Sequence, residues 1–492
     1  MNQFDYDAFV AVGYSRIPIT RTLLADTETP LSTFSKLCKA PYAFLFESVE
    51  GGEKWSRYSI VGLPATQRIS VSGKTVSRYQ GEELVESHES TDPLAEIEAL
   101  HQSASSVPLP SLPVFHGGWV GYFAYDTVRY VEPKLSVDVN PDDLGTPDIL
   151  LVLAEEVVVF DNLRGTLTLI VNAEASVPNA FGMAIERLDA LEQALAQPAA
   201  DLGSFELGST DTSDIESRLT YGNDKATFES WVAKIKDYIL DGDVMQVVVS
   251  QRMTLPFSAS PLNLYRALRH LNPSPYLFYL DLDSFHVVGS SPEILVRSEQ
   301  GKITVRPIAG TIRRGADEAE DRELATRLLN YEKERAEHLM LIDLGRNDIG
   351  RVSQPGSVTL TDKMVVEKYS HVMHIVSNVT GDAREDVTAI DSLRATLPAG
   401  TLSGAPKIRA MEIIDELEPV KRGIYGGAVG YLSWSGDMDT AIAIRTAVIK
   451  DNQLIVQAGA GVVADSVPEA EWEETLNKAR AVLRAAAMVE AC

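Results

Sequence analysis

The sequence predicts an α+β fold built on antiparallel sheets. Short β-branched and aromatic runs are separated by turns that contain Gly and Pro, while other stretches repeat apolar residues at helical spacing. Strands and helices come in runs rather than in regular βαβ alternation, which argues against a doubly wound parallel sheet. With 492 residues, the chain has room for about three domains of roughly 150 residues, although large folds often form one or two.

The N-terminal part of the chain is expected to contain mainly strands. Apolar or β-branched runs bounded by turns predict strands at 42–47, 58–62, 68–72 and 74–79, and a hairpin formed by 149–160 and 165–171. Helical spacing predicts helices at 87–105 and 177–195. The proline-rich segment 107–113 cannot be a central strand, because proline has no N–H to donate, and we interpret it as a connector.

Residues 197–221 are the best candidate for a linker, since they combine Pro, Ala, Gly, Ser and Thr with scattered acids and have no apolar period. We therefore expect an N-terminal domain at 1–196 and a C-terminal domain at 222–492.

The C-terminal part mixes both kinds of element. Apolar spacing predicts a helix that ends at Gly242, and further helices at 262–271, 319–342 and 469–489. Strands are predicted at 244–250, 276–282, 285–289, 294–297, 302–307, 372–379, 426–434, 440–450 and 453–458.

Composition excludes several classes of protein. The net charge is 44 − 70 = −26, so the chain repels phosphate backbones and nucleic acid is not an expected partner. Two cysteines, Cys38 and Cys492, cannot make a disulfide framework or a four-thiolate metal site, which fits the reducing cytoplasm. The acidic N-terminus has no apolar region typical of a signal peptide, and no run reaches the roughly 18–20 apolar residues that span a membrane.

Two predicted helices each carry a pair of glutamates three residues apart, Glu334/Glu337 and Glu471/Glu474. Residues at this spacing share a helix face. Four carboxylates around one cleft would suit Mg²⁺, a hard cation that prefers oxygen ligands. The alternative is a solvated helix face, with Glu474 pairing Lys478 at i+4.

Other residues could bind or transfer protons. His371 and His374 face opposite sides of a predicted strand, so they cannot share a metal, but one could act as an acid or base. Arg445 is a cation in an apolar run and needs an anionic partner, either a substrate carboxylate or a structural ion pair. Glycines at 424–431 and 458–463 would allow backbone N–H groups to approach a carboxylate, or could simply mark tight turns and strand packing.

Taken together, a series of sequence blocks resembles the chorismate-utilising enzymes, and most closely the large subunits of the branch that makes anthranilate. The resemblance covers nearly the whole chain and is densest from 242 to 487. The blocks are DVMQVVVSQR, NPSPYLFY, GSSPEIL, RPIAGT, AEHLMLIDLGRND, YSHVMH, LPAGTLSGAPK, YGGAVGY, AIAIRTA, QAGAGVVADS and EWEETLNKA. The implied fold is α+β, with two facing antiparallel sheets and helices outside, and with the active site in a cleft of the C-terminal, chorismate-binding domain.

The resemblance also assigns roles to residues of this chain. The implied Mg²⁺ carboxylates are Glu337 and Glu474, with Glu334 and Glu471 beside them. The implied catalytic residues are His374, Glu293, Thr401 and Gln246. The implied substrate-binding residues are Gly310, Thr311, Tyr425, Arg445, Gly459, Ala460 and Gly461.

The implied reaction is a Mg²⁺-dependent lyase reaction that converts chorismate and ammonia to anthranilate and pyruvate through aminodeoxyisochorismate, the first committed step of tryptophan synthesis. We expect Glu293 to protonate the departing hydroxyl, because a buried carboxyl can hold its proton at neutral pH. His374 is the expected base for the loss of pyruvate, and Arg445 is expected to hold the enolpyruvyl carboxylate.

Two positions separate the branches of the family. Members that make isochorismate or salicylate carry a lysine where this chain has Gln246, and aminodeoxychorismate synthases carry a lysine where it has Ala309. Without either lysine, ammonia is the expected nucleophile. The alternatives are another branch of the family, or a tryptophan-sensing protein that has lost catalysis.

Segments at 45–48, 58–59 and 272–277 resemble the walls of a feedback site for tryptophan. The motif LFES at 45–48 resembles the usual LLES, and Leu277 replaces the usual methionine. The implied tryptophan-binding residues are Glu47, Ser48, Tyr58, Ser59, Asn272, Pro273, Ser274, Pro275, Tyr276 and Leu277.

Ammonia is expected to come from a separate protein. A glutaminase needs a nucleophilic cysteine in a glycine-rich turn, and neither Cys38 nor Cys492 lies in one. We therefore expect a partner glutamine amidotransferase subunit, component II.

Overall fold

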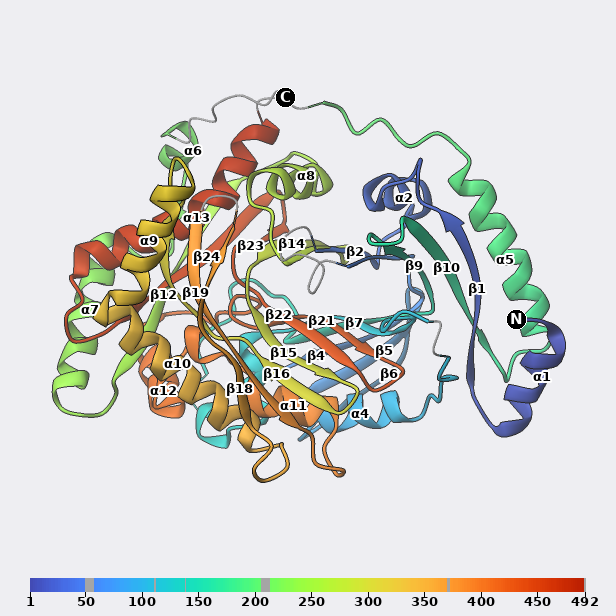
Figure 1. Cartoon of the computed structure of the whole chain (residues 1–492), viewed down its shortest axis with the longest axis horizontal. Helices are drawn as coiled ribbons and strands as arrows, with labels where there is room; N and C mark the ends of the chain where they lie inside the picture. Colours follow the sequence, from blue (N-terminus) through green and yellow to red (C-terminus); the bar gives the residue numbers. More distant parts are fainter. Residues whose placement is uncertain (49–56, 110–111, 138, 205–212, 370–371, 491–492) are drawn as a thin grey trace.

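Two antiparallel sheets face each other in the computed structural model of the chain (Figure 1). The structure describes all residues except 49–56, 110–111, 138, 205–212, 370–371 and 491–492. Within the described residues, each sheet has twelve strands. The prediction of an α+β fold with two facing antiparallel sheets is therefore confirmed.

The first sheet, sheet A, runs in the order β1-β10-β9-β3-β2-β13-β14-β23-β24-β12-β11, with β20 pairing β12 at one end. Its strands are β1 (Arg16–Leu24), β10 (Thr166–Glu174), β9 (Glu156–Asp161), β3 (Tyr58–Gly62), β2 (Ala43–Glu47), β13 (Tyr276–Asp281), β14 (Phe285–Ser291), β23 (Thr446–Lys450), β24 (Gln453–Val462), β12 (Gln246–Pro256), β11 (Thr220–Tyr221) and β20 (Gly404–Ala405).

The second sheet, sheet B, runs in the order β17-β19-β16-β15-β22-β21-β7-β8-β4-β5-β6, with β18 pairing β19. Its strands are β17 (Ile308–Arg313), β19 (Val372–Asp382), β16 (Lys302–Val305), β15 (Ile294–Glu299), β22 (Met438–Ile442), β21 (Ala428–Ser433), β7 (Gly118–Phe123), β8 (Ile149–Ala154), β4 (Gln67–Ser72), β5 (Thr75–Gln80), β6 (Glu83–Glu89) and β18 (Thr359–Lys368).

Helices cover the outer face of each sheet. A core between the sheets joins sheet A residues such as Phe278 and Val287 to sheet B residues such as Tyr122 and Val429. Outside sheet A lie α1 (Gln3–Val12), α2 (Pro30–Leu37), α5 (Ala180–Leu195), α6 (Ser213–Ser217), α7 (Lys225–Leu240), α8 (Pro261–Leu271), α12 (Lys407–Leu417) and α13 (Pro468–Glu490). Outside sheet B lie α4 (Pro93–Gln102), α10 (Glu332–Gly350) and α11 (Ala389–Thr396), and α9 (Glu318–Asn330) adjoins β17.

The chain passes directly from one sheet to the other at several points. The segment predicted as one strand at 149–160 is two strands, because β8 belongs to sheet B and β9 to sheet A. The segment 440–450 is likewise divided into β22 and β23. In both segments a charged residue interrupts the apolar run where the backbone changes sheets, Glu155 between β8 and β9 and Arg445 between β22 and β23.

Two helix predictions also need correction. The segment 87–105 begins in strand β6 and becomes helical only at Pro93, where Asp92 caps α4. The helix predicted at 319–342 is two helices, α9 and α10, which are separated at Tyr331. Helices α1, α2, α11 and α12, and strands β1, β6, β17 and β18, had no prediction of their own.

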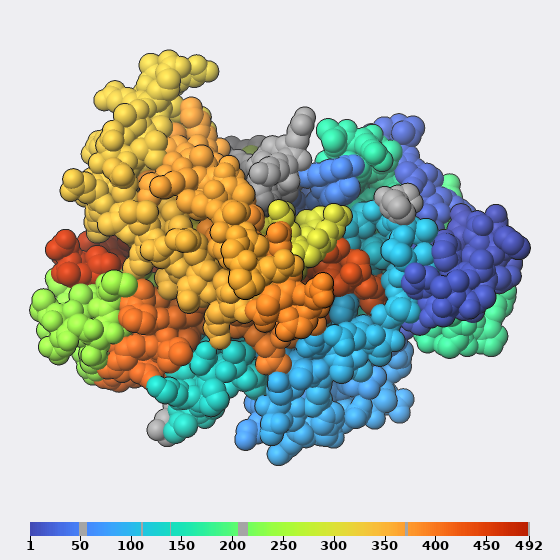
Figure 2. All heavy atoms as spheres, turned by 60° about the horizontal axis from the view of Figure 1, so that its bottom comes forward, coloured from blue at the N-terminus to red at the C-terminus, as the bar shows by residue number. Residues whose placement is uncertain are grey.

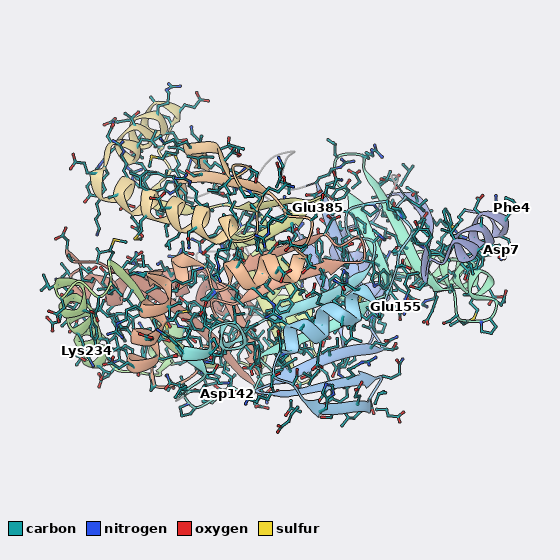
Figure 3. All side chains as sticks on the ribbon, turned by 90° about the horizontal axis from the view of Figure 1, so that it is seen from below. Phe4, Asp7, Asp142, Glu155, Lys234 and Glu385 are labelled. Carbon is teal, nitrogen blue, oxygen red and sulfur yellow. The ribbon has the colours of Figure 1, made fainter. Side chains whose placement is uncertain are left out.

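The two predicted domains both contribute to both sheets. Strand β2 pairs with β13, and β21 pairs with β7, so hydrogen bonds cross between 1–196 and 222–492 in each sheet. The predicted linker contains α6 and β11, and residues 205–212 of it lie outside the described part of the chain. Seen from below, Phe4 on α1 and Lys234 on α7 lie at opposite ends of the molecule (Figure 3).

In the space-filling view, the stretch coloured yellow, around α9, projects from the body of the molecule (Figure 2). In the part of the chain that the structure describes, no helix is both long enough and apolar enough to pass through a bilayer.

Candidate active site and regulatory pocket

Glu293 and Arg445 lie in two neighbouring links between the sheets. Glu293 stands between β14 of sheet A and β15 of sheet B, and Arg445 stands between β22 and β23. The backbone N–H of Ile442 donates to the carbonyl of Glu293 over 3.0 Å, which holds the two links together. Arg445 has a positive φ of 50°, a conformation that a non-glycine residue adopts only where its surroundings impose it.

The Glu293 carboxyl is placed to hold a proton at neutral pH. Burial raises its pKa to about 8, although a hydrogen bond from Thr401 and the charges of Arg445 and Lys478 act in the opposite direction. The Thr401 hydroxyl donates to Glu293 Oε1 over 3.2 Å. A carboxylic acid in this state can donate a proton to a leaving group.

The Arg445 guanidinium makes no hydrogen bond or ion pair to any residue that the structure describes. Burial lowers its pKa, whereas Glu293 and Tyr369 raise it. An arginine removed from water without an anionic partner favours binding of an anion from solution. This geometry supports the interpretation of Arg445 as a substrate-carboxylate site rather than as a structural ion pair.

His374 lies on β19 opposite Thr311 of β17. Its Nδ1 lies 3.0 Å from the carbonyl of Gly310 and 3.1 Å from the Thr311 hydroxyl. Because a carbonyl only accepts, Nδ1 carries the hydrogen and the Nε2 lone pair is left to take a proton. Burial lowers the pKa of His374 to about 4, so the imidazole is neutral at physiological pH. His371, its neighbour in the motif, lies outside the described residues.

Burial and charge repulsion among the four predicted glutamates raise the pKa of two of them. Burial first, and then the charges of Glu337 and Glu474, raise the pKa of Glu334. Burial and the charge of Glu474 also raise the pKa of Glu471, against a hydrogen bond from Ser466. The structure therefore brings α10 and α13 together at their glutamate pairs.

The donor chemistry of these glutamates fits a hard cation, since four mutually repelling carboxylates are relieved by a divalent charge. Among the described residues, however, no three His, Cys, Asp or Glu side chains already converge as a metal site. Lys478 forms an ion pair with one of the carboxylates, with its Nζ 2.7 Å from Glu474 Oε1. The alternative of an i+4 ion pair is therefore present alongside the carboxylate cluster.

Gln246 and the glycines of β24 complete the site. Gln246 Nε2 donates to Glu337 Oε1 over 3.3 Å, while Gln246 Oε1 is buried without a hydrogen-bond partner. A Cβ on Gly461 would lie 2.5 Å from Gln246 Nε2, and one on Gly459 would lie 2.8 Å from the Tyr425 hydroxyl. Glycine at these two positions lets β24 approach the polar side chains closely.

A cavity of about 1200 Å³ opens beside Glu337, the one of the four glutamates that lines it. On one side it is lined by Lys333, Glu337 and Met340 of α10. On the other side it is lined by β20 and α12, including Ala405 and Ile408. A second, much smaller cavity of about 40 Å³ adjoins Glu293 and Thr401.

A separate cavity of about 330 Å³ contains much of the predicted tryptophan site. It brings together Glu47 at the end of β2, the following Ser48, Tyr58 of β3, and Tyr276 and Leu277 of β13 with the preceding Pro275. The register of the sheet explains this, because Leu277 pairs directly with Glu47.

The other residues of that prediction do not line the cavity. Ser59 is buried and accepts from Asn162 over 3.2 Å. Asn272 and Ser274 bond to Ser290 and Ser291, and Pro273 lies between them. These four residues support the walls of the cavity instead of facing it.

The sequence interpretation missed several residues at both sites. In the 330 Å³ cavity, Arg297 and Asp439 form an ion pair of 2.6 Å, and Tyr276 donates to Asp439 over 2.8 Å. Arg297 and Asp439 face each other across β15 and β22, which only the strand register reveals. Glu47 itself receives Arg269 over 2.9 Å and the Tyr265 hydroxyl over 2.5 Å. At the active site, Lys478 also donates to the carbonyl of Gly459 over 2.9 Å.

Comparison with known proteins identifies relatives along the whole chain. The family model described as chorismate binding enzyme matches residues 44–484. Anthranilate synthase component 1 from Pseudomonas putida is 57% identical over 490 residues, which cover 100% of this chain and 99% of the relative. Anthranilate synthase component 1 from Aquifex aeolicus is 50% identical over 97% of this chain and 96% of its own length.

Solved structures agree with the fold. Anthranilate synthase component I from Streptococcus pneumoniae superimposes with a TM-score of 0.77 at 37% identity, covering 88% of this chain and 95% of that structure. The menaquinone-specific isochorismate synthase from Escherichia coli superimposes with a TM-score of 0.70 at 19% identity, over 98% of each chain, which is a likeness of fold alone.

Proposed function

The chain belongs to the chorismate binding enzymes, and from this premise we propose that it is the large subunit of an anthranilate synthase, a lyase that forms anthranilate and pyruvate from chorismate and ammonia. The observation that supports this most directly is a protonated Glu293 and a neutral His374 that both lie within the electrostatic influence of Arg445, which has no ion-pair partner among the described residues. This combination offers an acid, a base and an anion site to a single substrate.

The proposal is tested by incubating the purified chain with chorismate, Mg²⁺ and an ammonium salt. We expect anthranilate and pyruvate in equal amounts, and no anthranilate when glutamine replaces ammonium. Formation of isochorismate, salicylate or aminodeoxychorismate would assign the chain to another branch, and no consumption of chorismate would favour a protein that only senses tryptophan.

The side chains divide the work between two steps. In the first step, Glu293 gives its proton to the departing ring hydroxyl, and ammonia forms the new C–N bond to the ring. Gln246 can accept a hydrogen bond from ammonia through its buried Oε1 but cannot remove a proton from water as a lysine can. In the second step, His374 Nε2 takes the proton from the amine-bearing carbon, and pyruvate leaves as the ring becomes aromatic.

We propose Glu337 and Glu474 as the residues that would hold Mg²⁺, with Glu334 and Glu471 nearby. The ion would anchor the ring carboxylate of chorismate and withdraw electron density from the ring. Arg445, Tyr425, the neighbouring Thr311 and the backbone at Gly459, Ala460 and Gly461 would hold the enolpyruvyl group at the other end of the substrate.

Replacing His374 with Met should block the second step more than the first. The variant keeps an apolar side chain of similar volume on β19 but has no basic nitrogen, so pyruvate loss should slow by about 10²-fold. Aminodeoxyisochorismate should then accumulate, which chromatography of quenched reactions would detect.

The matched control is His88→Met, the same substitution at an exposed position on β6, which should leave both steps unchanged. If His374→Met instead stops chorismate consumption altogether, His374 acts in the first step and the division of roles is wrong.

We also propose that tryptophan binds in the 330 Å³ cavity and inhibits from there. The cavity holds Arg297 on β15 and Asp439 on β22, and the same two strands lead to Glu293 and Arg445. A ligand that favours one arrangement of β15 and β22 would therefore act on the catalytic links, with a coupling free energy of about 1–3 kcal/mol.

Replacing Ser48 with Phe should raise the inhibitory concentration of tryptophan at least tenfold, because the phenyl ring would fill part of the cavity. Turnover without tryptophan should change little, since the catalytic side chains lie elsewhere. Inhibition curves at fixed chorismate measure this effect, with Ser87→Phe at an exposed position on β6 as the matched control. Unchanged inhibition in a folded Ser48→Phe protein would move the tryptophan site away from this cavity.

Ammonia would be supplied by a partner glutamine amidotransferase. Burial raises the pKa of the Cys38 thiol well above its ordinary value, which opposes a role as a nucleophilic thiolate. Cys492 lies outside the described residues. The acidic, cysteine-poor composition is consistent with a cytoplasmic location.

A further inference from the structure

A buried ion pair lies beneath the candidate active site. Arg422 and Glu418 are 2% and 4% exposed, and the Arg422 guanidinium donates to both carboxylate oxygens of Glu418, over 2.6 and 2.8 Å. A bidentate arginine–carboxylate pair has a defined planar geometry. Neither residue has a part in the chemistry described above.

The other hydrogen bonds of Arg422 go to the backbone of two elements at the site. One donor reaches the carbonyl of Leu402 over 2.5 Å, next to Thr401, and another reaches the carbonyl of Val248 on β12 over 2.7 Å. The guanidinium also lies over two tyrosine rings, 4.7 Å from the centroid of Tyr125 and 5.6 Å from that of Tyr425. Arg422 therefore contacts Tyr425 directly and Thr401 through the adjoining backbone.

Glu418 connects the same pair to the glycine-rich strand β24. Its Oε1 accepts from both the backbone N–H and the hydroxyl of Ser250, each over 2.8 Å. Ser250 of β12 pairs in register with Gly459 of β24. Gln457, also on β24, donates to the Ser250 hydroxyl over 2.8 Å.

We propose that the Arg422–Glu418 ion pair is a positioning device that sets Tyr425, the Thr401 turn and the Gly459 backbone relative to one another for chorismate. This inference deepens the proposed function and rests on it. All three groups are assigned to the substrate site, yet they come from separate parts of the chain. The ion pair contacts Tyr425 and the turn that carries Thr401 directly, and it reaches Gly459 of β24 through Ser250 of β12.

The chemistry of arginine explains why this residue type is needed. A buried charge pair is not required for stability, because apolar residues of similar volume can replace such a pair. What the guanidinium supplies is a planar set of donors that can hold a carboxylate and two carbonyls at once while stacking on tyrosine. Lysine keeps the charge but lacks the planar fork.

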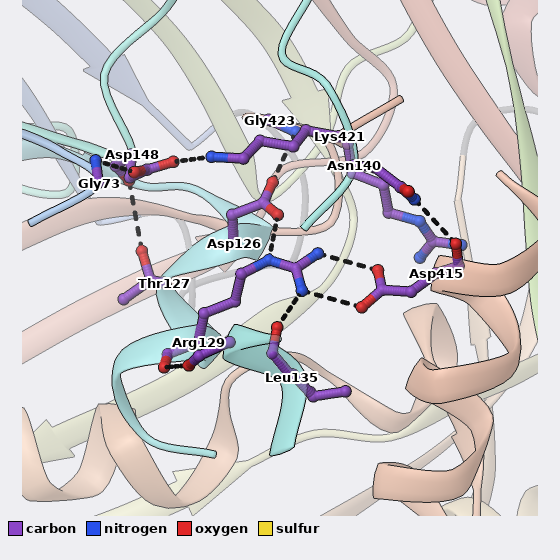
Figure 4. Close-up of polar contacts among 12 residues, drawn as sticks. Gly73, Asp126, Thr127, Arg129, Leu135, Asn140, Asp148, Asp415, Lys421 and Gly423 are labelled. Carbon is purple, nitrogen blue, oxygen red and sulfur yellow. Dashed lines mark hydrogen bonds and ion pairs between the residues drawn. The ribbon is translucent and has the colours of Figure 1, made fainter. Parts of the chain in front are cut away.

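The test uses two conservative variants, Arg422→Lys and Glu418→Gln. Their matched controls, Arg129→Lys and Asp415→Asn, alter a second arginine ion pair, in which Asp415 lies on α12, the helix that ends just before Glu418. There Arg129 donates to both oxygens of Asp415 over 2.8 Å and to Asp126 over 2.8 Å, and the pair touches none of the three positioned groups (Figure 4).

We expect Arg422→Lys and Glu418→Gln to weaken chorismate binding at least tenfold, measured as KM and by equilibrium dialysis without ammonia, with a smaller change in kcat. A second signature is expected in Arg422→Lys. Loosening Thr401 removes a hydrogen bond that favours ionised Glu293, so the alkaline limb of kcat should move to higher pH at a fixed concentration of un-ionised ammonia. Arg445, Lys478, Arg306 and Asp348, the other charged groups around Glu293, are unchanged in this variant.

The controls should keep the wild-type KM and pH profile even where they lower the melting temperature. The inference is overturned if Arg422→Lys or Glu418→Gln, shown by circular dichroism to be folded, binds chorismate as tightly as its control does. If both variants fail to fold, the test uses Tyr425→Phe with Arg422 intact. Unchanged chorismate affinity in this variant would show that the Tyr425 hydroxyl beside Gly459 does not contribute to chorismate binding, and would overturn the inference. Failure of the wild-type chain to make anthranilate would instead refute the proposed function, while the dialysis comparison would still report on the ion pair.

Discussion

Replacing Glu293 with Gln is expected to lower the rate of chorismate consumption by about 10²–10⁴-fold, the range that general acid catalysis contributes. The amide has nearly the same shape and can still accept the hydrogen bond from Thr401, but it has no acidic proton for the departing hydroxyl. Steady-state assays with saturating ammonium salt measure this effect. The chorismate KM should change much less than kcat, since Glu293 is assigned to chemistry rather than to binding.

The pH dependence of the wild-type enzyme should report the protonation state of Glu293. Glu293 must be protonated to act, and its pKa is raised to about 8, so activity at a fixed concentration of un-ionised ammonia should fall as the pH rises above about 8. Glu293→Gln should lose this alkaline limb together with most of its rate. Glu385→Gln, at an exposed position, is the control and should behave as wild type (Figure 3). Wild-type turnover in Glu293→Gln would assign the acid to another group.

Glu337→Gln and Glu474→Gln should each reduce Mg²⁺-dependent turnover at least 10²-fold, because each change removes one negative charge from a site for a hard cation. The readout that does not depend on activity is the affinity for Mg²⁺, measured by isothermal titration calorimetry on the free chain. Weaker binding by both variants, with an unchanged melting temperature, would support the assignment.

Two controls separate a metal site from a charged helix surface. Glu332→Gln on α10 and Glu473→Gln on α13 each remove one charge from an exposed position on the same helix, and both should leave Mg²⁺ affinity unchanged. If the four variants behave alike, Glu337 and Glu474 belong to a solvated helix face and are not the metal ligands. Lys478→Met should strengthen Mg²⁺ binding if the ion pair with Glu474 competes with the metal.

Local features of the fold were predicted from the sequence, whereas long-range features were not. Strands such as β2 and β13, and helices such as α7 and α8, were predicted because their apolar period and their turn residues are local properties. The points at which the chain changes sheets were not predicted, although Glu155 and Arg445 interrupt the apolar runs there, because an isolated charged residue can also lie within a single strand. A charged residue inside an apolar run indicates a break, but which sheet each half joins depends on strand pairing with distant parts of the chain.

By itself, the sequence determined the α+β class, the charge, the absence of a cysteine framework and, through its motifs, the family. Only the tertiary structure decided that 1–196 and 222–492 share both sheets, that Arg297 pairs with Asp439, and that Arg422 and Glu418 lie beneath Tyr425. The physical reason is that composition and periodicity are summed along the chain, whereas strand register, burial and ion pairing depend on residues brought together from distant positions.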